Sequence, residues 1–396
     1  MKKTIRISFL ILVLVLVVPA LWAQNTVFET QSEHYRVLSE ISEEHSAAVA
    51  EQMEAMLELY NDQFRFPVDE LEVPMRVRVF ATKARFDSYL RRLIDESRDG
   101  YVYLHYNDLA KSELVGYYTE SESLGRSMIH QSFIQFFRAF IPNPPLWIRE
   151  GFAVFYEGSV YDPDFGAAIY RENLAWLDTL KDLVNGIGGA AIPLDQMLEL
   201  SLEDARARID VFYPQAWGMV SFLLNSEDPE INRILWDSLS ALAPEATLAE
   251  NTESVYREAF RWAPEETLVE EFVGYISDRR SFRGWVEYGV EAYNADDVDE
   301  SERAFVQALK LNEENYVPYY YLGLINYRRQ NYGLADYYYQ AALEYGADEP
   351  ITLYALGVNA YADNRFEDAV SYLELTVDRD PAYRDKAEDL LIRIRG

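Results

Sequence analysis

The chain has 396 residues, no cysteine and a formal net charge of −31. Without cysteine it can form no disulfide and carry no lipid on an N-terminal cysteine, and a negative field of this size repels phosphate backbones, so we expect no nucleic-acid partner. The apolar fraction of 49% is that of a globular protein, so folding must rest on ordinary hydrophobic cores.

Residues 1–23 have the pattern of a secretory signal peptide. Lys2, Lys3 and Arg6 precede an unbroken apolar run over 9–18, and small residues end the segment. The run is short for a membrane span, although an uncleaved N-terminal anchor is the alternative. No later apolar run is long enough to cross a membrane. We expect an exported protein, periplasmic or extracellular, with no membrane span after signal cleavage.

Residues 25–118 mix strand and helix patterns. Val77 and Val79, for example, alternate with Arg76 and Arg78, as in a half-buried strand. Helical spacing of apolar residues separates such segments. We expect strands at 35–39, 75–79, 101–105 and 114–118, and helices at 42–64 and 86–93. This mixture predicts an α+β N-terminal region.

Residues 119–280 have helical patterns almost throughout. The first two predicted helices flank a Pro-rich turn at 142–145, where Asn143 and Pro144 suit the N-cap and first position of the second helix. Further helices are predicted at 166–185, 202–209, 213–225, 229–242, 252–262 and 264–278. We therefore expect a mainly helical region.

Residues 282–396 repeat with a period of 34 residues. Gly289, Gly323 and Gly357 are 34 residues apart, and each is followed by a small residue after twelve positions and a bulky one after sixteen. The small residues are Ser301, Ala335 and Ala369, and the bulky ones are Phe305, Tyr339 and Leu373. This pattern resembles the tetratricopeptide repeat, a helix–turn–helix unit of 34 residues. We expect an all-α solenoid of three units, at about 282–315, 316–349 and 350–383, plus a capping helix.

The segment PLWIREGFA at 145–153 resembles part of another known domain. The chain from about 28 to 278 is similar to the peptidase MA-like, or gluzincin-type, metallopeptidase domain. That family has H-E-x-x-H on one helix, then a Pro-rich turn and a helix that opens with P-L-W-x-x-E-G-x-A. Two histidines one turn apart bind one zinc, and the glutamate beside the first acts as general base. A glutamate on the second helix is the third ligand. The resemblance implies a zincin-like fold for the helical region.

The catalytic positions of that pattern are largely replaced. The first motif reads HQSFI at 130–134, so the resemblance places His130 and Glu150 at two ligand positions. Gln131 stands at the base position and cannot take a proton at a useful pH, and Ile134 stands at the second ligand position without a lone pair. A catalytic zinc site needs three protein ligands and a water. We therefore expect a pseudopeptidase with no catalytic residue, no metal and no other cofactor, in which His130 and Glu150 are residual ligand candidates.

Structural roles are the alternatives at these positions. His130 would be a buried histidine bonded to a neighbour such as Glu150, and Glu150 would pair with His130, Arg126 or Arg138. By the resemblance, Tyr213 stands where a downstream tyrosine can stabilise an oxyanion. The alternative for Tyr213 is a core aromatic side chain.

Tyrosines recur in the repeat region. In tetratricopeptide repeats the first helix of each unit lines a concave groove, and Tyr293, Tyr327 and Tyr361 each follow a repeat glycine by four residues. Tyr320 and Tyr354 precede their glycines by three and should flank that row. Tyrosine joins apolar area to a hydrogen-bonding tip, which suits recognition of a protein or peptide. Packing between helices is the alternative role.

The sequence thus predicts an exported, non-catalytic scaffold or adaptor that combines a degenerate peptidase-like domain with a repeat module for protein interaction. Two alternatives stay open. One is an active zinc metallopeptidase with a non-standard site, and the other is a purely structural repeat protein of the cell envelope.

Overall fold

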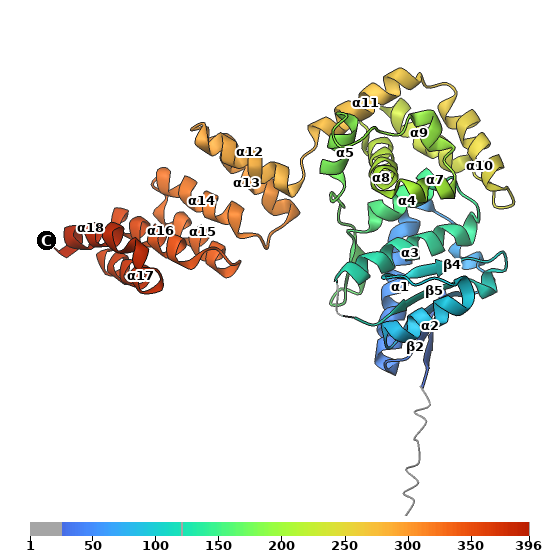
Figure 1. The fold of residues 1–396 in the computed structure, drawn as a ribbon, viewed down its shortest axis with the longest axis horizontal. Coiled ribbons are helices and arrows are strands. Elements are labelled where there is room, and N and C mark those ends of the chain that lie inside the picture. The colour runs from blue at the N-terminus through green and yellow to red at the C-terminus, as the bar shows by residue number, and fades with distance from the viewer. Residues whose placement is uncertain (1–25, 120–121, 396) are drawn as a thin grey trace, which may run out of the picture.

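The computed structural model describes residues 26–119 and 122–395. A region with a five-stranded sheet comes first along the chain, and a mainly helical region follows it (Figure 1). The predicted outline, an α+β region followed by a mainly helical one, is confirmed. The predicted signal peptide lies outside the described residues. Within the described ranges, no helix combines the length and apolar character that a bilayer crossing requires. The chain as far as helix α11 (Glu265–Asp278) forms one body, and the later helices extend from it as an arm (Figure 1).

The sheet has the strand order β1-β2-β3-β5-β4. Its strands are β1 (Phe28–Gln31), β2 (Tyr35–Ser39), β3 (Met75–Phe80), β4 (Val102–Leu104) and β5 (Glu113–Tyr117). The three central strands are parallel, and β1 and β4 are antiparallel edge strands. The four predicted strands are confirmed to within a residue or two. The sequence analysis missed β1, which is short and only half-buried.

Helices cover both faces of the sheet. The helices in contact with its strands are α1 (Glu43–Phe64), α2 (Lys83–Ile94) and α3 (Glu122–Phe140), and α4 (Leu146–Tyr156) packs on α3. Short 3-10 turns are η1 (Val68–Glu70) and η2 (Leu109–Lys111). A small cluster that includes Phe86 and Val115 joins α2 to the sheet. The main core joins α1 to α3 and α4, and the buried Tyr60 hydroxyl donates to the Ile129 carbonyl at 3.1 Å. The two predicted helices before residue 100 are thereby confirmed.

The start of α4 differs from the prediction. The helix begins at Leu146 after Pro145, so Asn143 is not its N-cap. Asn143 instead joins the turn to a distant segment, because its side chain donates to the Ala246 carbonyl and its own carbonyl accepts from Asn251. The prediction of an Asn143–Pro144 cap was wrong because this tertiary contact determines where the helix begins.

The rest of the body contains one hairpin and a set of helices. The hairpin is β6 (Val160–Asp162) and β7 (Ala167–Ile169), and the helices are α5 (Leu177–Val184), α6 (Leu194–Leu198), α7 (Leu202–Ala207), α8 (Ile209–Asn225), α9 (Pro229–Ser240), α10 (Leu248–Val255), the π-turn η3 (Tyr256–Phe260) and α11. The predicted helix at 166–185 was wrong over its first half. The Asp162 carboxylate accepts from two backbone N–H groups in the hairpin turn, and Gly166 has a φ of 62°. Both features favour a turn over a helix.

The arm consists of helix pairs. They are α12 (Phe282–Asn294) with α13 (Val298–Leu311), α14 (Tyr316–Arg328) with α15 (Tyr332–Glu344), and α16 (Glu349–Ala362) with α17 (Phe366–Arg379), followed by η4 (Pro381–Tyr383) and α18 (Arg384–Arg395). Each repeat glycine lies on the first helix of a pair, directly against the bulky residue sixteen positions later. A Cβ on Gly323 would lie 2.5 Å from the Tyr339 ring, and one on Gly289 would lie 2.9 Å from the Phe305 ring. The 34-residue period therefore records the close packing of each pair.

Polar contacts fix the arm to the body. Ser281 accepts a hydrogen bond from the Gly284 N–H at the start of α12 and donates to the Asp178 carboxylate of α5. Arg283 of α12 pairs with the same carboxylate, with 3.2 Å between Arg283 Nη2 and Asp178 Oδ2. Asp178 thus joins the start of the arm to α5, and Lys181 of α5 holds the end of α11 by donating to the Ser277 carbonyl.

Candidate functional site

A cleft of about 980 Å³ opens between helices α3 and α4, strand β4 and helices α7 and α8. Gln131, Ile134, Glu150 and Tyr213 line this cleft. His130 is 5% exposed and lies against Glu150 and the Tyr213 ring. The structure thus brings together His130, Gln131, Ile134, Glu150 and Tyr213, the five positions that the sequence pattern singled out.

Close packing of two helices holds α4 in this place. A Cβ added to Gly151 would lie 2.4 Å from the Ala216 carbonyl oxygen of α8. Because a backbone atom cannot move aside as a side chain can, only glycine allows α4 and α8 to cross at this distance. This contact places Glu150 opposite α3, facing His130.

Both ring nitrogens of His130 are bonded to carboxylates. Nε2 lies 3.1 Å from Glu150 Oε2, and Nδ1 lies 2.6 Å from Glu157 Oε1. Burial alone would lower the pKa of His130, but the hydrogen bonds and charges of the two glutamates outweigh burial and raise the pKa to about 9. At neutral pH the ring is therefore a cation that donates from both nitrogens.

Glu150 is held on its other side by an arginine. Arg149 Nε and Nη2 lie 2.8 and 2.6 Å from Glu150 Oε1. Burial would raise the pKa of Glu150, but the charges of Arg149 and His130 and their hydrogen bonds lower it to about 2. The suggested partners Arg126 and Arg138 are replaced by Arg149, and Arg138 donates instead to the Pro142 carbonyl.

Glu157 completes the arrangement and was missed by the sequence analysis. It follows Glu150 by seven residues, about two helical turns, so that the carboxylate just after α4 lies on the same side as Glu150; this spacing would have been the signal to look for. Its second oxygen accepts from Asn173 Nδ2 at 3.0 Å. We call Arg149, Glu150, His130, Glu157 and Asn173 the His130 network. Positive and negative groups alternate from Arg149 to Glu157, and the neutral Asn173 amide ends the network, so each carboxylate contacts a donor on two sides.

Gln131 has a structural role in this fold. Its Oε1 accepts from the Tyr103 N–H of β4 at 3.1 Å, and Ser127, one turn earlier on α3, accepts from the Tyr101 N–H at 2.9 Å. These N–H groups face away from β5, on the outer edge of the sheet. An extended peptide could pair with this edge only by displacing α3 side chains.

The remaining two positions also serve the core and the cleft wall. Ile134 is 6% exposed and belongs to the main core, while its neighbour Gln135 turns away and donates to the Arg76 carbonyl of β3. Tyr213 is half-buried. Burial, followed by the charge of Glu150, raises the pKa of Tyr213 above its usual value, so its hydroxyl stays protonated at neutral pH.

The donor set around His130 does not fit zinc. A metal ligand must offer a lone pair, and the imidazolium has none because each nitrogen donates to a carboxylate. Both ring nitrogens are already bonded to carboxylates, whereas a ligating histidine needs one nitrogen free for the ion. Gln131 and Ile134 supply neither a base nor a further ligand. What the arrangement can do is join α3 to α4 through buried charge pairs.

The His130 network should make the free energy of unfolding depend on pH. Because the folded state raises the pKa of His130 from 6.5 to about 9, its stabilising effect is complete below pH 6.5 and is lost as the pH rises through about 9. Because the pKa of Glu150 falls from 4.5 to about 2, its contribution is lost only as the pH falls through that range. We expect urea unfolding to show a loss of up to about 3 kcal/mol between pH 6 and pH 9.5. In His130→Gln that loss should disappear, and an equal loss in both chains would contradict the assignment.

Comparison of the chain with protein-family models and with curated proteins gave no match.

Proposed function

We propose that this protein is an exported, non-catalytic scaffold or adaptor. Its body would be a degenerate peptidase MA-like domain with a zincin-like fold, and its arm a module of three tetratricopeptide-type units. The observation that carries the proposal is that both ring nitrogens of His130 lie within hydrogen-bond distance of a carboxylate, Nε2 of Glu150 and Nδ1 of Glu157. Ion pairs of His130 with Glu150 and Glu157 occupy the position where the resemblance would place a metal.

Three further features of the body support a loss of hydrolysis. Gln131 accepts a backbone hydrogen bond from β4, so the position of the general base is taken by a structural group. Ile134 is packed in the core. Tyr213 could still donate a hydrogen bond, but a donor without an activated nucleophile does not cleave a peptide.

The packing of the arm supports the repeat assignment. A glycine on each first helix lies against Phe305, Tyr339 or Leu373 on the second, at the same offset in all three pairs. A two-helix unit of this kind buries its apolar face by stacking on its neighbours. Stacked units present an extended surface, which is why we place partner recognition in the arm.

The repeated tyrosines are candidates for that recognition. Tyr293, Tyr327 and Tyr361 are all half-buried, so part of each ring packs between helices and part remains accessible. Tyr320 and Tyr354 are half-buried as well and pack against other tyrosines. The alternative packing role therefore accounts for some of their area, and the accessible part is what a protein or peptide partner would contact.

Substitution of two of these tyrosines tests the proposed surface. The full-length chain carrying Tyr327→Ala and Tyr361→Ala should lose at least about tenfold in the amount of protein partner captured from envelope extracts. Tyr337→Ala is the matched control, because that side chain is 62% exposed and lies on a second helix. Equal capture by all three chains would contradict recognition through these rings.

A direct assay tests the loss of catalysis. The purified chain, supplied with zinc, should hydrolyse neither casein nor a mixed peptide library above the rate of the His130→Ala variant. Hydrolysis that disappears in both His130→Ala and Glu150→Gln would instead establish the alternative of an active metallopeptidase. A chain that neither hydrolyses peptides nor loses a partner on tyrosine substitution would favour the purely structural reading.

A further inference from the structure

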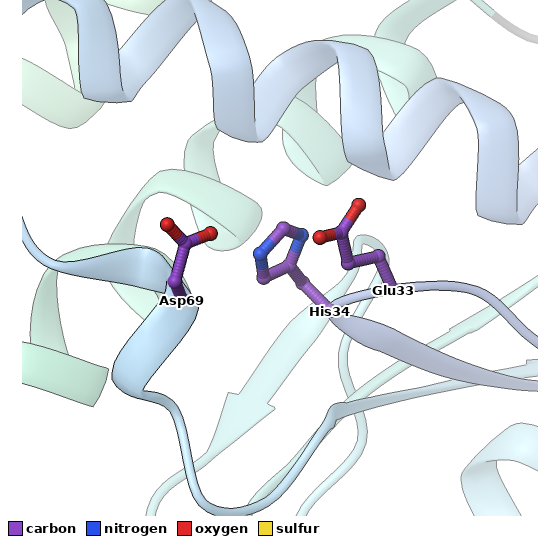
Figure 2. Close-up of side chains that lie close together, drawn as sticks. All are labelled: Glu33, His34 and Asp69. Atoms are coloured by element: carbon purple, nitrogen blue, oxygen red, sulfur yellow. The ribbon is translucent and has the colours of Figure 1, made fainter.

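A second cluster of possible metal ligands lies at the N-terminal ends of two parallel strands, β2 and β3, and shares no residue with the His130 network. Glu33 and His34 directly precede β2, and Asp69 lies in η1, before β3. One ligand atom from each residue lies within 4.8 Å of the other two. Figure 2 shows the His34 ring between the two carboxylates, with one ring nitrogen facing Asp69.

Backbone hydrogen bonds fix the turn that carries Glu33 and His34. The His34 carbonyl accepts from the Met75 N–H at 2.8 Å, which joins the first residue of β3 to the turn before β2. The same turn is closed by the Ser32 N–H, which donates to the Tyr35 carbonyl at 2.9 Å. The backbone of His34 is thus fixed by strand pairing.

Glu54 of α1 fixes the orientation of the ring. Its Oε1 accepts from the His34 backbone N–H at 2.7 Å, and its Oε2 lies 2.8 Å from Nδ1. When Nδ1 of a neutral imidazole donates to a carboxylate, Nε2 carries the lone pair that a metal ion can bind. A histidine that ligates a metal commonly has its other nitrogen bonded in this way, to a carboxylate in the second shell.

The free nitrogen is buried and unpartnered. His34 is 9% exposed, and its Nε2 has no hydrogen-bond partner among residues 26–119 and 122–395. Leaving a buried ring nitrogen unpaired costs free energy, so native proteins rarely do so without a ligand or water. Glu33 and Asp69 are exposed carboxylates beside the buried His34 ring, and their oxygens can bind an ion together with Nε2.

From this geometry we propose that Glu33, His34 and Asp69 bind one zinc ion, with His34 ligating through Nε2 and Glu54 acting as the positioning residue. One imidazole nitrogen and two carboxylate oxygens suit zinc, and a water would complete four-coordination. Bound zinc would join the turn before β2 to the segment before β3. The site shares no residue with the His130 network, so it stands or falls independently of the proposed function.

Zinc binding to the full-length chain tests the proposal. Titration by calorimetry in 0.15 M salt with 1 mM Mg²⁺ should show one zinc per chain and a rise in the midpoint of thermal unfolding. His34→Gln should abolish both effects, and Glu33→Gln with Asp69→Asn should weaken binding at least about 100-fold. The latter substitutions are exposed, so they separate lost binding from lost folding.

Two controls distinguish a built site from general attraction of cations to an acidic surface. Glu70→Gln with Glu72→Gln removes the same number of charges, from the loop that carries Asp69, and should leave zinc affinity within about twofold. Glu54→Gln should weaken binding roughly tenfold while the fold is kept. Equal zinc affinity in the unmodified chain and in the Glu33→Gln/Asp69→Asn variant, or loss of zinc on His130→Ala instead, would overturn the proposal.

Discussion

Replacing His130 by alanine should lower the free energy of unfolding by about 2–4 kcal/mol, measured by urea denaturation at pH 7. The substitution leaves Glu150 and Glu157 facing each other across the space of the lost ring. Glu150 keeps Arg149 and Glu157 keeps Asn173, so the loss is smaller than for an entirely unpaired buried charge. It still includes a cavity in a site where the ring is 5% exposed.

Two other histidine variants separate charge from volume. The side chain of the half-buried His45 bonds the Ser39 hydroxyl and makes an edge contact with the Tyr118 ring, so His45→Ala should cost about 1 kcal/mol. His130→Gln fills most of the space without the charge and should fall between the two alanine variants. If His130→Ala were no less stable than His45→Ala, the His130 network would not stabilise the fold.

Restoring the two replaced positions should create zinc affinity between α3 and α4. Gln131→Glu keeps an acceptor for the Tyr103 N–H, and Ile134→His places a nitrogen one turn from His130, on the wall of the cleft beside Glu150. We expect the double variant to bind zinc at least about 100-fold more tightly at this site than the parent chain, because a third protein ligand is regained.

The measurement should be made in chains that also carry Glu33→Gln and Asp69→Asn, so that the proposed N-terminal zinc site does not contribute. Gln131→Glu alone is the matched control, since it adds the base without the ligand and should bind no better than the parent. A folded double variant with unchanged affinity would show that the resemblance aligns α3 wrongly.

Much of the fold follows from periodicity in the sequence. The alternation of valine and arginine before Phe80 predicted β3, and helical spacing of apolar residues predicted α1 to within a residue. Strand β1 and the hairpin at 160–169 were missed because their residues are mostly half-buried or exposed, so hydrophobic periodicity carries little signal there. The start of α4 depends on a contact between Asn143 and Asn251, which no local pattern reveals.

The candidate site was predictable in its parts but not in its bonding. The spacing of His130 and Glu150 indicated that they meet, and they do so at 3.1 Å. That Arg149 rather than Arg138 would pair with Glu150 depends on side-chain directions across two helices, and so does the second bond of His130 to Glu157. His34 lies in an irregular turn, where neither spacing nor a motif pointed to Glu54 or Asp69.

The proposal that His130 is an ion-pair partner and not a zinc ligand is tested by measuring the protonation state of its ring. We would record ¹⁵N spectra of the four histidines during a zinc titration at pH 7. We expect both His130 nitrogens to be protonated and not to respond to zinc, while His34 responds through one nitrogen. Assignments follow from single His→Gln variants. A neutral His130 ring whose Nε2 signal shifts with zinc, together with peptide hydrolysis, would contradict the account.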